Sequence, residues 1–165
     1  MYPENYVKLR YMENHDMPRL AGLVPDEKAR RNFTALLYFL KGTVLLYGGQ
    51  EYSCDRVPSL FDKDVFPRTG RDITPLLQKL NAVRREHLSA EDWFTAEADD
   101  ANDIAVCLRD DGKKKKLGVF SLKGKSAEVD VPVQDGDYVN FITGDTVTVQ
   151  GGKLRCTGEP VMISE

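Results

Sequence analysis

Apolar residues recur with a helical period in two stretches of the first half of the chain. The first stretch runs from about Asp26 to Leu40 and predicts an amphipathic helix with its N-cap at Asp26. The second begins near Thr74, where Pro75 occupies a position that helix starts favour. The pattern therefore predicts two helices, each with one buried stripe.

A strand pattern precedes each of these helices. Residues 6–12 alternate between apolar and polar side chains, whereas Thr43–Tyr47 is apolar on both faces. A strand that is apolar on both faces is typical of a parallel sheet covered by helices. The order strand, helix, strand, helix therefore predicts an α/β arrangement for the first part of the chain.

From Asp92 onward the period changes to two. Short strand patterns alternate with turn signals such as Asp110-Asp111-Gly112 and Asp135-Gly136-Asp137. Lys113–Lys116 is expected to form a solvated hairpin tip. The predicted strands are 93–98, 104–109, 117–122, 127–131, 138–142, 146–149, 153–156 and 161–163. Regularly spaced short strands predict an antiparallel sandwich or barrel-like sheet, with the domain boundary near Ser89–Asp92.

Polar side chains follow both strands of the first part. Asn14-His15-Asp16 comes directly after the first strand, and Gly48-Gly49-Gln50-Glu51 ends the second. Because parallel strands end at a common edge where chemistry collects, these groups are expected to lie near each other. The connection from Gly48 to Ile73 has no clear periodicity, and loops of this length are more often functional than not. The alternative for Asn14-His15-Asp16 is a simple turn with an Asx cap.

The two segments together resemble the α-amylase family of glycoside hydrolases. Asn14-His15-Asp16, continued by Met17-Pro18-Arg19, resembles that family's fourth conserved region, and Gly42–Glu51 resembles its eighth barrel strand. The resemblance implies an α/β plus all-β fold. Residues 1–90 would be the last two strand–helix units of the catalytic (β/α)8 TIM barrel, and residues 91–165 a C-terminal antiparallel β-sandwich domain.

The resemblance also implies roles for individual residues. Asp16 would be the family's third carboxylate, which stabilises the transition state, and His15 and Asn14 would bind the sugar. Arg19 has two interpretations, contact with substrate or an ion pair with a neighbouring carboxylate, of which the ion pair is favoured. Gln50 and Glu51 are expected to shape the sheet edge through hydrogen bonds.

The residues that the family uses as nucleophile and acid/base are not matched in this chain, because they lie on earlier barrel strands. The chain is therefore expected to be a C-terminal fragment of a retaining enzyme acting on α-glucosidic bonds, of α-amylase or α-glucosidase type, and inactive by itself. Two alternatives stay open. One is a glycan-binding or structural β-sandwich module, which a row of exposed aromatic side chains would indicate, and the other is a transglycosylase or isomerase of the same family.

The composition of the chain limits the classes of partner that it could bind. A net charge of −3 argues against a nucleic-acid partner, and no stretch approaches the length of a membrane span. Three scattered cysteines predict neither a disulfide framework nor a zinc site, although one disulfide stays possible. No cofactor or metal is expected. The expected partners are an α-glucan or maltooligosaccharide for the parent enzyme, and a second copy of the chain through its barrel strands. The compartment is not readable from the sequence.

Overall fold

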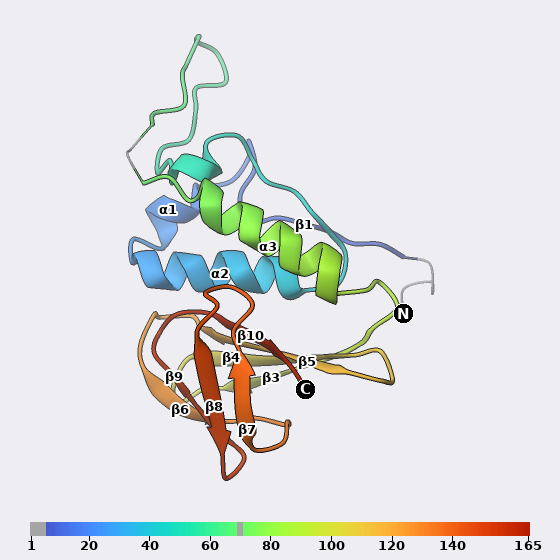
Figure 1. Cartoon of the computed structure of the whole chain (residues 1–165). Helices are drawn as coiled ribbons and strands as arrows, with labels where there is room; N and C mark the ends of the chain where they lie inside the picture. The colour runs from blue at the N-terminus through green and yellow to red at the C-terminus, as the bar shows by residue number, and fades with distance from the viewer. Residues whose placement is uncertain (1–5, 69–70) are drawn as a thin grey trace.

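The computed structural model describes residues 6–68 and 71–165. In this part of the chain, three helices lie above two antiparallel sheets, and a long loop projects from the helical end (Figure 1). Residues 1–5 and 69–70 of the predicted first domain lie outside the described residues. None of the helices in the described part of the chain has the length and apolarity that a membrane span needs.

The two predicted helices are present. Helix α2 spans Glu27–Phe39, and the Asp26 carboxylate caps it by accepting a 2.7 Å hydrogen bond from the amide of Ala29. Helix α3 spans Thr74–His87 and has Pro75 in its first turn. A short helix α1, Leu20–Leu23, and a 3₁₀ turn η1, Gln50–Tyr52, were not predicted. The local sequence patterns therefore located the longer helices correctly.

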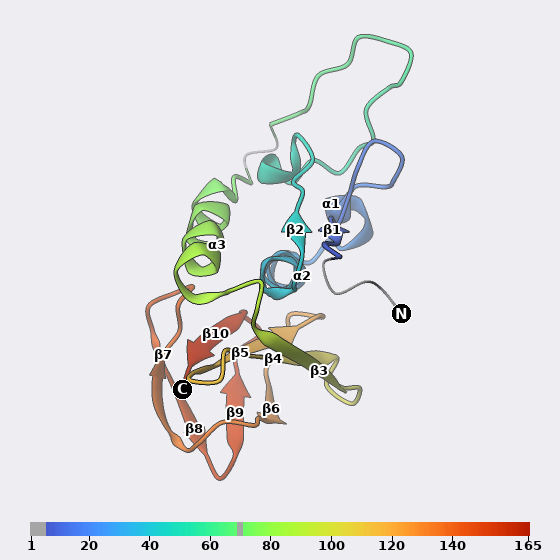
Figure 2. The ribbon, with the colours of Figure 1, turned by 90° about the vertical axis from the view of Figure 1, so that its right-hand side faces the viewer.

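The two strands of the first part pair in parallel but are shorter than predicted. Strand β1 is Leu9–Arg10 and strand β2 is Thr43–Val44, with Leu9 opposite Thr43. Figure 2 shows them side by side, to the right of α3. The prediction of a doubly buried strand over 43–47 was wrong, since Leu46 is 38% exposed. In the described residues each strand has a partner on one side only, and the pairing does not close into a barrel.

All eight predicted strands of the second part are present and antiparallel. One sheet has the order β10-β5-β4-β3 and the other β6-β9-β8-β7. Their bounds are β3 Trp93–Asp99, β4 Ile104–Asp110, β5 Lys115–Ser121, β6 Ala127–Asp130, β7 Gly136–Val139, β8 Thr146–Gln150, β9 Lys153–Cys156 and β10 Val161–Ser164. The antiparallel β part of the predicted fold is thereby confirmed.

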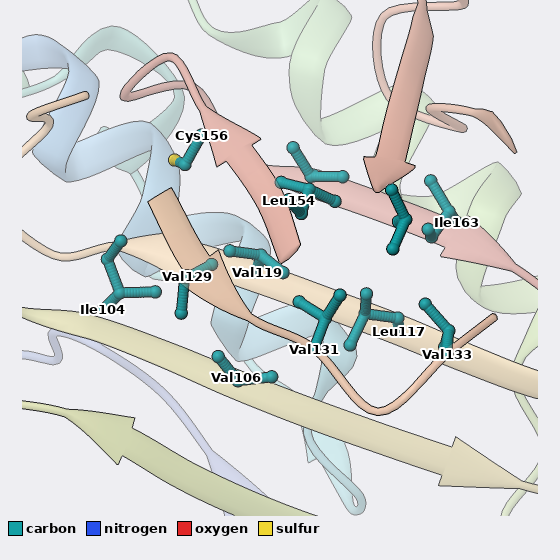
Figure 3. Packing of buried hydrophobic residues seen from close by; sticks show 12 residues of the cluster. Ile104, Val106, Leu117, Val119, Val129, Val131, Val133, Leu154, Cys156 and Ile163 are labelled. Atoms are coloured by element: carbon teal, nitrogen blue, oxygen red, sulfur yellow. The ribbon is translucent and has the colours of Figure 1, made fainter. Parts of the chain in front are cut away.

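Strands β4, β5 and β10 of the first sheet contribute buried residues to both of its faces. Alternate residues of β4, β5 and β10 point towards the second sheet, and the cluster between the sheets includes Val106, Val119 and Ile163 (Figure 3). The residues between them, such as Cys107, Phe120 and Met162, pack against the helices. Because strand side chains alternate between faces, one sheet can join two cores. The layers are therefore helices, sheet and sheet.

A buried ionic junction joins the helices to this middle sheet. Arg109 on β4 lies 3.0 Å from the Asp92 carboxylate and donates a 2.8 Å hydrogen bond to the carbonyl of Phe39 at the end of α2. Lys116 lies 3.6 Å from Asp92 and contacts Asp111. The predicted solvated tip is therefore wrong for Lys116, which is 5% exposed.

Candidate functional site

The Asn14-His15-Asp16 segment forms a tight surface turn after β1. The side-chain oxygen of Asn14 accepts a 2.9 Å hydrogen bond from the amide of Asp16, which is the Asx turn considered as an alternative. His15 Nε2 lies 3.2 Å from Asp16 Oδ2, and these two side chains are 64% and 71% exposed. The turn therefore presents a carboxylate and an imidazole together to solvent.

The turn after β2 forms the neighbouring part of the site. Gly49 has a φ of 88°, a conformation that favours glycine, and its amide donates a 2.8 Å hydrogen bond to the Glu51 carboxylate. Gln50 Oε1 accepts from the amide of Tyr47 at 3.4 Å. Gln50 and Glu51 thus shape the edge by hydrogen bonding, as predicted.

Arg19 joins the two turns from below. It donates a 2.9 Å hydrogen bond to the carbonyl of Gly48, and its guanidinium lies 4.8 Å from the ring centre of Tyr47 and 5.5 Å from that of Phe66. Arg19 Nη2 is also 2.8 Å from Glu13 Oε1, and both side chains are at most 1% exposed. The structure thus gives Arg19 the ion pair considered from the sequence and leaves it almost no surface for substrate in this chain.

Glu13 is the residue that sequence reasoning missed. Its second carboxylate oxygen accepts a 2.6 Å hydrogen bond from the amide of Leu20. Burial raises the pKa of Glu13, and the Leu20 amide and Arg19 oppose that rise. The available signal was a carboxylate and an arginine flanking Asn14-His15-Asp16, but nothing local in the sequence shows that the two are buried together.

The other titratable groups near the two turns do not form a metal site. Within residues 6–68 and 71–165, no group of three or more His, Cys, Asp or Glu side chains is arranged to hold a metal ion. Asp64 is held by Arg56 through two contacts of 2.6 and 2.8 Å. The cysteines Cys54, Cys107 and Cys156 are buried and free, so the disulfide alternative is excluded.

The described chain thus combines helices and one pair of parallel strands with two antiparallel sheets. The sequence model of the bacterial alpha amylase C-terminal domain matches residues 95–163. An alpha-amylase from Lactobacillus plantarum is 30% identical, with a TM-score of 0.85, over 99% of this chain and 39% of that one. These findings place the chain in the α-amylase family, as its motifs predicted.

More distant structures share the fold. The noncanonic maltogenic alpha-amylase AmyB from Thermotoga neapolitana is 23% identical with a TM-score of 0.82, over 99% of this chain and 42% of that one. The cyclomaltodextrin glucanotransferase CldA is 18% identical with a TM-score of 0.76, over 99% of this chain and 37% of that one. A search of curated proteins found no match. The chain spans about two fifths of each of these three enzymes, so their activities are not thereby shown for it.

Proposed function

We propose that this chain is the C-terminal part of a retaining glycoside hydrolase that acts on α-glucosidic bonds, of α-amylase or α-glucosidase type. The observation that carries the proposal is the exposed His15–Asp16 pair in the turn that follows β1, joined to the turn after β2 through Arg19 and Gly48. The 30% identity with an alpha-amylase over nearly the whole chain supports it independently.

Asp16 is the group assigned to chemistry. Glycoside hydrolysis passes through an oxocarbenium-like transition state, and a carboxylate beside the ring stabilises the developing positive charge. His15 would donate a hydrogen bond to the same sugar, and Asn14 would hold the turn and contribute to binding. Arg19, which is buried, would act on the substrate only through the turn that it holds. The nucleophile and the acid/base would come from earlier barrel strands.

The domain assignment follows from this proposal. Residues 1–90 would complete a TIM barrel, and residues 91–165 would be the β-sandwich domain. The parallel β1–β2 pair, backed by α2 and α3, supports the barrel part. A cleft of about 1000 Å³ lies beside these strands, lined by Lys8, Arg10, Thr43, Asn81 and Arg84 among others. It offers room for further chain against the open strand pair.

The same open surface would make the isolated chain associate with itself. Val7 is 66% exposed and Leu9 54%, and strand edges without partners pair readily. We expect a homodimer that buries β1 and β2. Light scattering over a range of concentrations tests this; a chain that stays monomeric at high concentration would contradict it.

The alternatives differ in their support. The glycan-binding module predicted a row of exposed aromatic side chains, but of Trp93, Phe94, Tyr138 and Phe141 only Trp93 is exposed. Phe141 instead stacks on His87, with ring centres 3.9 Å apart. A transglycosylase is the second candidate, favoured by the shared fold with a glucanotransferase.

The test of the function uses two samples. The purified 165-residue chain is incubated with a chromogenic maltooligosaccharide and is expected to show no turnover, because the covalent route needs the nucleophile. The longest natural protein containing this chain is expected to hydrolyse the same substrate. Turnover that co-purifies with the short chain would overturn the fragment assignment, and a longer protein without activity on any α-glucan would overturn the function.

A further inference from the structure

The exposed turn is flanked by two buried charged residues. Residues 14–17 are at least partly exposed, whereas Glu13 and Arg19, at either end of the segment, are each 1% exposed. Charged side chains are almost never buried this fully unless they are paired. The burial of these two residues next to an exposed catalytic candidate therefore requires an explanation.

Their contacts form a closed ring around the base of the turn. Glu13 Oε2 accepts from the Leu20 amide at 2.6 Å, just beyond the segment, and Glu13 Oε1 lies 2.8 Å from Arg19 Nη2. The first contact joins the start of the segment to its end. The same Arg19 nitrogen donates to the carbonyl of Gly48 at 2.9 Å. The ring is thereby fastened to the turn that follows the adjacent strand.

Aromatic rings and backbone enclose the guanidinium of Arg19. The rings of Tyr47 and Phe66 flank the guanidinium, and Gly49 lies against it. A Cβ atom at Gly49 would come within 3.0 Å of Arg19 Nη2 and 2.9 Å of Cys54 Sγ. The backbone of the second turn is therefore shaped to admit Arg19.

A buried ion pair of this kind is weak evidence of a contribution to stability. Burial raises the pKa of Glu13, which means that removing the carboxylate from water outweighs the attraction of its partners. Arg19 Nε and Nη1 are buried without a hydrogen-bond partner among the described residues. Buried ion pairs are often no more stabilising than apolar residues of the same volume, and their best attested use is to specify one arrangement.

We propose that Glu13 and Arg19 are positioning residues: their buried pair fixes the turn that carries Asp16 at a set place relative to the turn after β2. This inference rests on the proposed function only for what Asp16 then does to a sugar. The geometric part, a fixed turn, stands on the contacts alone.

The first measurement needs no variant. Backbone order parameters of residues 14–18 in the 165-residue chain are expected near those of rigid backbone, about 0.85, despite the exposure of the turn. The Leu20 amide, held by Glu13, is expected to exchange slowly. Order parameters below about 0.6 across the turn would overturn the proposal.

The decisive variants separate geometry from stability. Glu13→Leu combined with Arg19→Met replaces the ion pair by apolar groups of similar size, and is expected to stay folded because such exchanges are often neutral. Residues 14–18 are nevertheless expected to lose order. Glu13→Gln alone is expected to do the same while leaving Arg19 buried without a charged partner. Arg56→Gln, which breaks the exposed pair with Asp64 on the next loop, is the matched control and should leave the turn unchanged.

Kinetics in the longest natural protein that contains the chain give the functional readout. The double variant is expected to lower kcat about 100-fold, the usual scale for a catalytic group displaced by about 1 Å, with a smaller change in KM. An ordered turn and normal kcat in a folded double variant would overturn the proposal. A disordered turn in a protein that never acted on α-glucans would instead refute the proposed function and leave the positioning role standing.

Discussion

Replacing Arg109 by methionine should destabilise the chain more than any surface arginine could. Arg109 is 2% exposed, lies 3.0 Å from Asp92, and donates to the carbonyls of Phe39 and Ser89. Burial lowers the pKa of Arg109, and Asp92 opposes that shift. Methionine keeps most of the aliphatic volume and removes every donor, so the loss reports on the polar junction rather than on a cavity.

The expected loss of stability follows from the buried Asp92 carboxylate, which Arg109→Met deprives of one of its partners. Removing one partner of a buried ion pair costs about 3–5 kcal/mol, because the other charge stays buried. Lys116 remains 3.6 Å from Asp92, which places the expected loss at the lower end, about 3 kcal/mol. A domain of this kind has only about 5–15 kcal/mol in total. With a urea slope of about 2 kcal/mol/M, the midpoint should fall by about 1.5 M.

The assay is urea unfolding followed by the fluorescence of Trp93, the only tryptophan of the chain, which pairs with Asp110 beside Arg109. Arg85→Met is the control, since the side chain of Arg85 is 77% exposed and bonds to the adjacent Glu86. Its effect should be within about 0.5 kcal/mol. A loss below about 1 kcal/mol for Arg109→Met would refute the view that this junction joins helices and sheet.

Two further predictions concern ionisation. Hydrogen bonds from Arg56, followed by the Ser59 amide, hold the pKa of Asp64 well below its ordinary 3.8. This contribution to loop stability is therefore present above pH 3.8 and is lost as the pH falls through the lower folded value. Carbon-detected NMR titration should show the lowered pKa, and Arg56→Gln should return it towards 3.8. Burial raises the pKa of Cys107 to about 12, so the folded chain favours the thiol, and the corresponding stability is present below pH 9 and is lost as the pH rises through about 12. Native chain should therefore leave Cys107 unmodified by iodoacetamide at pH 8, as mass spectrometry can determine, and modification as fast as in urea would contradict this.

The sequence was sufficient to predict the helices and strands whose patterns depend on residues close together in the chain. The stripe from Ala29 to Leu40, the Asp26 cap and the period-two strands after Trp93 each depend on residues a few positions apart, and the structure confirms them. The lengths of β1 and β2 were not predictable in the same way. A parallel strand extends only as far as its neighbours do, and in the described residues each of these strands has one neighbour.

The buried charges were beyond sequence reasoning for a related reason. Glu13, Arg19, Arg109 and Lys116 carry side chains that are usually exposed, and no local pattern distinguishes them from solvated ones. Their burial follows from tertiary packing, in which Arg19 meets the carbonyl of Gly48 and Arg109 meets Asp92. The exposed part of the candidate site, Asn14-His15-Asp16, was instead found from its motif, and its catalytic role stays a prediction.

The most direct test of that role is Asp16→Asn in the longest natural protein that contains the chain, assayed on a maltooligosaccharide. Asparagine keeps the shape of the side chain, which is exposed, and removes its charge. The account predicts an unchanged circular dichroism spectrum and turnover lower by two to three decades, about 3–4 kcal/mol in the barrier, with a smaller loss for His15→Ala. Near-normal turnover of the Asp16→Asn protein would contradict the assignment and leave Asn14-His15-Asp16 as a turn.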